Sequence, residues 1–148
     1  MKKEKIIELL NNDLKNEWKH HCFYLHNAGT IEGIHSKEYK EYLLSQAKSE
    51  MDHVAAFSDL IVGLGGNPTK EVNEYPTLRN PEEILLYAME MESEVVNNYV
   101  ERINQAEELG GVDGKWLVIF LESQIEDSRK DLDELKQITK SFSTNTQL

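Results

Sequence analysis

The chain has 148 residues, of which 39% are hydrophobic and 29% are charged, and its net charge is −11 at pH 7. This length suits a single domain with its own hydrophobic core, and the acidic charge argues against binding to nucleic acid or to an anionic membrane, because both require a basic surface. The only cysteine, Cys22, excludes an intrachain disulfide, and the sequence lacks the apolar runs of a signal peptide or of a membrane-spanning helix, which favours the cytoplasm.

Hydrophobic residues recur at helical spacing in two segments of the first half of the chain. The first predicted helix runs from about Lys3 to Ala28 and stops before Gly29. The second begins at Ser36 and stops at Gly63. The residues expected to face inward are Ile7, Leu10, Leu14, His21 and Leu25 in the first helix and Leu43, Ala47, Val54, Phe57 and Ile61 in the second.

Two further helices are predicted in the second half of the chain. The third begins at Asn80-Pro81, where the asparagine caps the helix and the proline suits its first turn, and the fourth begins near Asp113. The residues expected to face inward are Ile84, Ala88, Met91, Val95, Tyr99 and Ile103 in the third helix and Leu117, Leu121, Ile125, Leu132, Leu135 and Ile138 in the fourth. We expect residues 1–142 to form one domain and residues 143–148 to be a disordered tail.

The long connection between the second and third helices distinguishes two topologies. Residues 65–81 reach roughly 55 Å when extended, whereas a helix of the predicted length is about 40 Å long. The connection can therefore run the whole length of the bundle. We predict an all-α four-helix bundle with one long crossover between helices two and three, and the alternative is an up-and-down bundle with a flexible loop.

Glutamates and tyrosines repeat with the same spacing in the first and third predicted helices. Glu17 is followed seven residues later by Tyr24, and Glu92 is followed seven residues later by Tyr99. Seven residues make two turns of a helix, so each glutamate lies on the same face as its tyrosine. Both glutamates fall on the hydrophobic face, where a carboxylate is unfavourable unless it is paired or bound to a metal.

The second predicted helix adds Glu50 and His53, which are three residues apart and project from the same face. A glutamate from each of two helices, together with Glu-x-x-His motifs from the others, is the ligand pattern of dinuclear carboxylate sites in helical bundles. Carboxylates suit iron or manganese, and imidazole adds a nitrogen ligand. With these motifs the chain resembles the ferritin-like superfamily, in particular ferritins and bacterioferritins, over nearly its whole length.

The resemblance implies a metal site and a reaction. The residues that it assigns to the ligands are Glu17, Glu50, His53 and Glu92, with Tyr24 and Tyr99 close by. Glu50 would bridge two ions, and the other glutamates would be terminal ligands. The implied activity is that of an iron-dependent oxidoreductase or ferroxidase, which binds ferrous iron within the bundle and oxidises it with dioxygen or peroxide. Manganese and zinc are the alternative metals.

The fourth predicted helix departs from the pattern of this family, which expects a second Glu-x-x-His there. The stretch FLESQIEDSRKDLDELKQI allows two registers, either Glu126 with Arg129 or Ser128 with Asp131. The hydrophobic residues that follow Asp131 match those that follow His53, whereas Glu126 points to solvent. Ser128 and Asp131 are therefore predicted to face the site, and the expected glutamate is missing.

Asp131 is thus predicted to complete the ligand set as a terminal ligand, with Gln124 and His21 close to the site. Such a set could hold two ions asymmetrically, one ion or none. His20 is expected at a helix interface. Met51 stands where bacterioferritins bind an intersubunit haem through a methionine, but haem is not expected.

Three functions are compatible with these motifs. The first is a ferroxidase whose partners are metal ions and dioxygen or peroxide. The second is iron storage in a closed shell, but the few residues after Lys140 are too short for the additional helix of such shells, which favours a homodimer or small homo-oligomer. The third is a bundle that has lost its metal and acts as a structural or binding protein, and the missing glutamate in the fourth helix supports it.

Overall fold

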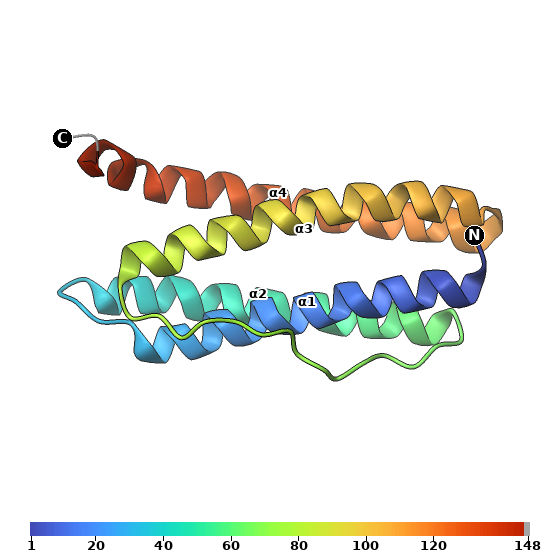
Figure 1. The fold of residues 1–148 in the computed structure, drawn as a ribbon, viewed down its shortest axis with the longest axis horizontal. Coiled ribbons are helices and arrows are strands. Elements are labelled where there is room, and N and C mark those ends of the chain that lie inside the picture. Colours follow the sequence, from blue (N-terminus) through green and yellow to red (C-terminus); the bar gives the residue numbers. More distant parts are fainter. Residues whose placement is uncertain (147–148) are drawn as a thin grey trace.

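The computed structural model describes residues 1–146, which form four α-helices and contain no strand. The helices are α1 (Lys3–Thr30), α2 (Ser36–Gly63), α3 (Pro81–Leu109) and α4 (Gly111–Thr146). They lie side by side along one long axis as a four-helix bundle (Figure 1), which confirms the predicted fold class. Within the described residues, no helix is long and apolar enough to cross a membrane. The boundary expected after residue 142 falls within α4, and residues 147–148 of the predicted tail lie outside the described residues.

The connection between α2 and α3, residues 64–80, runs along the bundle from one end to the other beside α1 (Figure 1). Side chains of α1 hold this connection near both of its ends. Asn11 accepts a hydrogen bond from the Thr69 amide at 2.8 Å, and Asn27 accepts one from the Leu78 amide at 2.6 Å. The predicted crossover is therefore confirmed, and hydrogen bonds fix it against α1.

Local sequence explains how the second hairpin of helices begins and turns. The Oδ1 atom of Asn80 accepts hydrogen bonds from the amides of Glu82 at 2.9 Å and Glu83 at 3.2 Å, as expected of a helix cap. At the other end of α3, Gly110 and Gly111 have φ angles of 68° and 66°. Glycine adopts such positive φ angles without a steric penalty, so this pair allows α4 to follow α3 after a single residue.

The core consists of two hydrophobic clusters, one towards each end of the bundle, and a polar layer lies between them. The cluster near the α3–α4 turn includes Leu10, Phe57, Tyr99 and Leu121, and the cluster near the α1–α2 turn includes Phe23, Leu43, Leu85 and Leu135. Because α1 packs mainly on α2 and α3 mainly on α4, the bundle is two antiparallel hairpins joined by the crossover. The polar layer therefore lies where the two hairpins face each other.

The inward face of α1 differs from the prediction. Leu25, which was expected inside, is 49% exposed, and Tyr24 is fully buried instead. His20 is likewise buried, whereas His21 is half-buried and its Nδ1 atom lies 2.7 Å from the Ala47 carbonyl oxygen. Adjacent residues of a helix point about 100° apart, and hydrophobic residues flank both sides of the predicted stripe. The prediction was correct for Leu10 and Leu14, which are fully buried, and for Tyr24, which was expected on the face of Glu17. It was wrong by one residue for His21 and Leu25, because packing against the partner helices decides which flank is buried.

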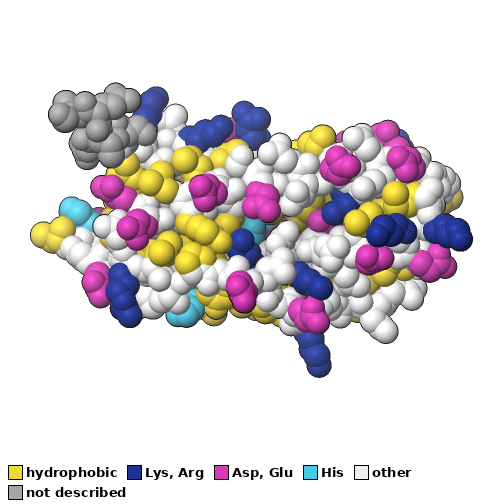
Figure 2. Space-filling view, viewed as in Figure 1, with side chains coloured by type: hydrophobic (Ala, Val, Ile, Leu, Met, Phe, Trp, Pro, Cys, Tyr) yellow, Lys and Arg dark blue, Asp and Glu magenta, His cyan; other side chains and the backbone are white. Residues whose placement is uncertain are grey.

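The surface carries mixed charges. On the face shown in Figure 2, acidic and basic side chains are spread over both hairpins, with hydrophobic side chains exposed between them. Across the whole chain, 27 acidic residues outnumber 16 basic ones. Acidic side chains therefore outnumber basic ones in the molecule as a whole, although both signs are present on this face (Figure 2).

Candidate metal centre

A polar layer crosses the middle of the bundle between the two hydrophobic clusters. Glu17 and His20 come from α1, Glu50 and His53 from α2, and Glu92 from α3. Each of these side chains belongs to a residue that is no more than 6% exposed. Ionisable groups at this depth are unfavourable unless they pair with one another or bind a metal.

Glu17, Glu50 and His53 form the first group, in which one ligand atom from each residue lies within 4.8 Å of the others. The Nδ1 atom of His53 is 3.1 Å from Glu50 Oε2 and 3.5 Å from Glu17 Oε2. Glu50 and His53 are neighbours because they are one turn apart on α2. Glu17 reaches them from α1, which packs along α2 in the same hairpin.

His20, Glu50 and Glu92 form the second group, within the same limit of 4.8 Å. The Nδ1 atom of His20 is 3.7 Å from Glu92 Oε1. Glu50 belongs to both groups, so its carboxylate lies between two positions at which a cation could bind. Each position is completed by one imidazole and one further carboxylate.

The two buried tyrosines join the hairpins across this layer. Tyr24 on α1 donates a hydrogen bond to Glu92 on α3 at 3.1 Å, and Tyr99 on α3 donates one to Glu17 on α1. Each tyrosine therefore binds the glutamate of the opposite helix rather than the glutamate seven residues before it. Each hydroxyl donates to Oε1 of the carboxylate, so Oε2 of both glutamates takes no part in these hydrogen bonds.

Three buried carboxylate oxygens have no hydrogen-bond partner among the described residues, namely Glu17 Oε2, Glu50 Oε1 and Glu92 Oε2. Leaving one such acceptor unsatisfied costs roughly 1–3 kcal/mol, and more when it is charged. A divalent cation bound to these oxygens would remove that penalty. Carboxylate oxygens together with imidazole nitrogens suit iron, manganese and zinc, so the residues present fit the metal that the resemblance implies.

Burial and mutual charge set the protonation of the layer. Burial raises the pKa of Glu50 well above its usual value, and repulsion from Glu17 adds to this shift. Burial acts to lower the pKa of both histidines, but Glu92 outweighs it and raises the pKa of His20 to about 9. Glu17 and Glu50 likewise raise the pKa of His53 to about 11. At neutral pH each imidazole therefore carries a proton that a bound cation has to displace.

The fourth helix presents different chemistry to this layer. Its buried polar residues on either side of Asp127 are the neutral Gln124 and Ser128, which are 6% and 2% exposed. Asp131 is half-buried and belongs to neither group of candidate ligands. Burial, followed by repulsion from Glu92, raises the pKa of Asp131 to about 6, so this carboxyl is close enough to interact with the charges of the layer.

Two groups that contact the layer were not predicted from the sequence. The first is His20, which lies in the layer. The sequence pattern that could have identified it is Glu17-x-x-His20, which has the same spacing as Glu50-x-x-His53 but lies on the first helix, whereas a second such motif was expected on the fourth. The other group is Asp127, whose Oδ2 atom is 3.7 Å from His53 Nε2 although its side chain is 54% exposed. Nothing in the sequence pattern of α4 distinguishes Asp127 from the other solvent-facing acids.

A buried ion pair lies one turn away from the layer and was also not predicted. Arg102 donates to both carboxylate oxygens of Asp13, at 2.7 Å and 2.9 Å. Asp13 precedes Glu17 by one turn of α1, and Arg102 follows Tyr99 by one turn of α3. This pair links the same two helices as the tyrosine–glutamate bonds, so it helps to fix the distance across the site.

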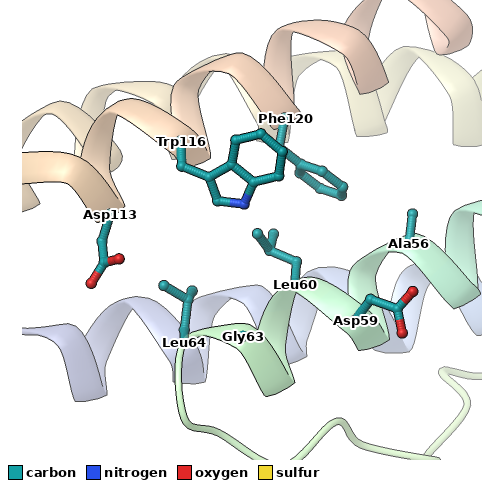
Figure 3. Close-up of a pocket in the computed structure, with 8 residues that line it drawn as sticks. All are labelled: Ala56, Asp59, Leu60, Gly63, Leu64, Asp113, Trp116 and Phe120. Atoms are coloured by element: carbon teal, nitrogen blue, oxygen red, sulfur yellow. The ribbon is translucent and has the colours of Figure 1, made fainter.

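A separate pocket of about 360 Å³ lies between α2 and α4, towards the α3–α4 turn (Figure 3). Trp116 and Phe120 of α4 point across it towards Leu60 and Leu64 of α2 (Figure 3). None of the five ionisable residues of the polar layer lines this pocket. The site with metal-binding chemistry is therefore the buried layer rather than the open pocket.

Comparison with known sequences and structures identifies the relatives of this chain. The profile of the Ferritin-like domain family matches residues 7–144. A structure from Bacillus anthracis strain Ames, described as a ferritin-like, diiron-carboxylate protein, is 31% identical, with a TM-score of 0.84 over 93% of this chain and 99% of that chain. No curated protein sequence matches.

Two bacterioferritin structures have the same fold at lower identity. That of Desulfovibrio desulfuricans, described as having a diiron site in different catalytic states, is 22% identical, with a TM-score of 0.86 over 96% of this chain and 82% of that chain. That of Rhodobacter capsulatus, described with a metal-free dinuclear site and a haem iron, is 20% identical, with a TM-score of 0.82 over 95% of this chain and 87% of that chain.

Proposed function

This chain belongs to the Ferritin-like domain family, and from that premise we propose that its buried Glu/His layer binds ferrous iron and promotes its oxidation by dioxygen or peroxide. The observation that carries the proposal is the position of Glu50. Its carboxylate belongs to both groups of candidate ligands, and its Oε1 atom is buried without a hydrogen-bond partner. A shared carboxylate between two groups is what a dinuclear carboxylate site requires.

The proposed roles follow from the contacts of each residue. Glu17 and His53 hold one ion, Glu92 holds the other, and Glu50 lies between them. Asp131, half-buried on α4, is proposed as a further carboxylate for the second ion. Ferrous iron, as the substrate, supplies the electrons that reduce the oxidant.

The protein contributes burial, orientation and proton release. The layer is closed at both ends by hydrophobic clusters, which limits access of bulk water to it. Tyr24 and Tyr99 fix the orientation of Glu92 and Glu17 by hydrogen bonds. Loading with iron displaces protons from the imidazoles, because coordination requires a neutral ring. We therefore expect iron binding to strengthen as the pH rises from acidic to neutral.

Anaerobic loading followed by exposure to air tests the proposal. Metal-free protein is given ferrous iron, separated from unbound iron, analysed for iron content, and then exposed to air while its absorbance is followed. We expect retained iron and an absorbance change in the wild type. In Glu92→Gln, which loses a carboxylate ligand of one ion, we expect less retained iron and a smaller absorbance change. Glu94→Gln is the matched control, because Glu94 lies two residues away on α3 and is exposed.

The alternative function is a bundle without catalytic metal that acts as a structural or binding protein. The observation that favours it is the absence of a glutamate or histidine of α4 from both groups of candidate ligands. If wild-type protein retains no iron, and its absorbance in air does not differ from a buffer blank, the ferroxidase proposal is wrong and this alternative holds.

For the assembly, we propose a homodimer or small homo-oligomer. Leu44, Met51 and Val62 support it, because these large hydrophobic residues of α2 are 41%, 43% and 59% exposed. Their spacing of seven and eleven residues places them on one side of the helix. Light scattering at several concentrations tests the assembly, and the mass of a large shell or of a monomer would contradict it.

A further inference from the structure

The first hairpin contains two Glu-x-x-His motifs, Glu17-x-x-His20 on α1 and Glu50-x-x-His53 on α2. In each motif the two side chains are three residues apart and share one face of the helix. Both motifs are buried, with His20 3% and His53 6% exposed. The second hairpin has no such motif in the layer. Val95 follows Glu92 by three residues on α3, so the position that matches His20 holds a hydrophobic side chain.

We infer that His20 is the imidazole ligand of the second metal ion and takes the place of the histidine that α4 lacks. This inference rests on the proposed metal-binding function. Under it, each ion has one histidine and one glutamate of its own and shares Glu50. The ligands of the first ion are Glu17, His53 and Glu50, and those of the second are Glu92, His20 and Glu50.

The distances around His20 support a ligand more than a simple hydrogen bond. Its Nδ1 atom is 3.7 Å from Glu92 Oε1, beyond the distance of about 2.7–3.2 Å that an N–H···O bond requires. Two ligands of one ion lie roughly 3–4 Å apart when each bond is about 2.0–2.2 Å long. The distance between His20 Nδ1 and the Glu92 carboxylate falls in this range, so the two side chains are close enough to be ligands of one ion.

An independent observation also points to a ligand at this position. Glu92 is fully buried, and its Oε2 atom has no hydrogen-bond partner among residues 1–146. Glu50 belongs to the same group, and its Oε1 atom likewise has no hydrogen-bond partner among these residues. Tyr24 occupies only the Oε1 atom of Glu92, so the free oxygen can bind a cation without loss of that hydrogen bond.

Titration with cobalt(II) tests the inference without any oxidation of the metal. Tag-free wild type, His20→Ala and His26→Ala are titrated by calorimetry and by visible absorption. His26 is the matched control, because it lies on α1 but is exposed. We expect about two ions per chain in the wild type and in His26→Ala. In His20→Ala we expect the first ion to bind as before, and the second to bind at least about tenfold more weakly.

The outcomes separate this inference from the proposed function. If the wild type binds no cobalt, the proposed metal site itself is wrong. If His20→Ala binds two ions as tightly as the wild type, the site stands and the role of His20 is refuted. Should His20→Ala fail to fold, ring-nitrogen NMR of zinc-loaded wild type decides the question. A shift of one His20 ring nitrogen to the coordinated range supports the inference, and an unshifted ring refutes it.

Discussion

The two hairpins of the bundle have the same architecture but different chemistry. In each hairpin two long antiparallel helices pack together, and a glutamate on the first helix is followed by a tyrosine two turns later. The α1–α2 hairpin places two glutamates and two histidines in the buried layer, whereas the α3–α4 hairpin places one glutamate there, beside the neutral Gln124 and Ser128. Hydrophobic packing therefore preserves the symmetry of the fold, while a few polar positions decide where the candidate metal ligands lie.

The largest expected effect comes from the residue that both candidate ion positions share. Glu50→Gln keeps the shape of the side chain but removes the charge that a bridging ligand needs. We expect it to abolish binding of both ions. By contrast, His53→Ala should weaken chiefly the binding of the first ion. Asp52→Asn is the matched control, because Asp52 is exposed on the same helix. Elemental analysis after loading measures the effect, and retention of two ions by Glu50→Gln would contradict the shared role.

A second prediction concerns the ligand residues that the α3–α4 hairpin lacks. In Ser128→Glu/Asp131→His, α4 gains the Glu-x-x-His that the first hairpin already has. We expect tighter binding of the second ion, and a metal-free protein that is less stable by about 1–3 kcal/mol, because Ser128 is 2% exposed and the new carboxylate is buried. Cobalt titration and denaturant unfolding measure the two effects. Unchanged affinity would show that α4 does not reach the ions.

The sequence predicted the bundle and its crossover because those features depend on periodicity and on the reach of the chain. It also placed Glu17, Glu50, His53 and Glu92 on inward faces, and the structure brings them together. Their role as ligands is a proposal. His20 was misplaced because the predicted stripe of α1 was centred one residue away, on His21. The hydrophobic pattern locates the buried face of a helix only to within about one residue, which corresponds to about 100° of rotation. Whether His20 or His21 is buried therefore depends on the contacts of α1 with its neighbouring helices.

The fourth helix shows a second reason why the prediction was incomplete. Ser128 lies in the layer, as its register predicted, but Asp131 is only half-buried, and exposed Asp127 approaches His53 instead. The depth of an acid at the edge of a helical stripe depends on the separation of α2 and α4. Between those helices Phe120 of α4 contacts Phe57 of α2, whereas Trp116 lines the open pocket (Figure 3) and is 55% exposed. Helical phase contains no information about that separation.

The histidines give the metal-free protein a pH dependence of known sign. The pKa of His20 is raised from 6.5 to about 9, so the folded chain binds a proton that the unfolded chain releases between these values. The resulting stabilisation is fully present below pH 6.5 and is lost as the pH rises through 9. We expect the melting temperature of the metal-free wild type to fall over this interval, and to fall less in His20→Ala. A melting temperature that rises with pH there would contradict the assigned charges.

The smallest expected effects come from the tyrosines that join the hairpins. Tyr99→Phe removes the hydrogen bond to Glu17, and Tyr24→Phe removes the bond to Glu92. Each should reduce the stability of the metal-free protein by roughly 0.5–1.5 kcal/mol. Each tyrosine binds the glutamate of the other hairpin. We therefore expect Tyr99→Phe to weaken binding of the first ion, which Glu17 holds, and Tyr24→Phe to weaken binding of the second, which Glu92 holds. Stepwise cobalt titration of both variants measures the two affinities. Weaker binding of the second ion in Tyr99→Phe, and of the first ion in Tyr24→Phe, would contradict the assignment.

Anomalous diffraction from iron-loaded crystals tests the central claim most directly, because it locates every bound ion without reference to activity. We expect two iron peaks in the polar layer, on either side of the Glu50 carboxylate, one beside Glu17 and His53 and the other beside Glu92 and His20. A layer without iron peaks, or iron bound only at the acidic surface, would contradict this claim.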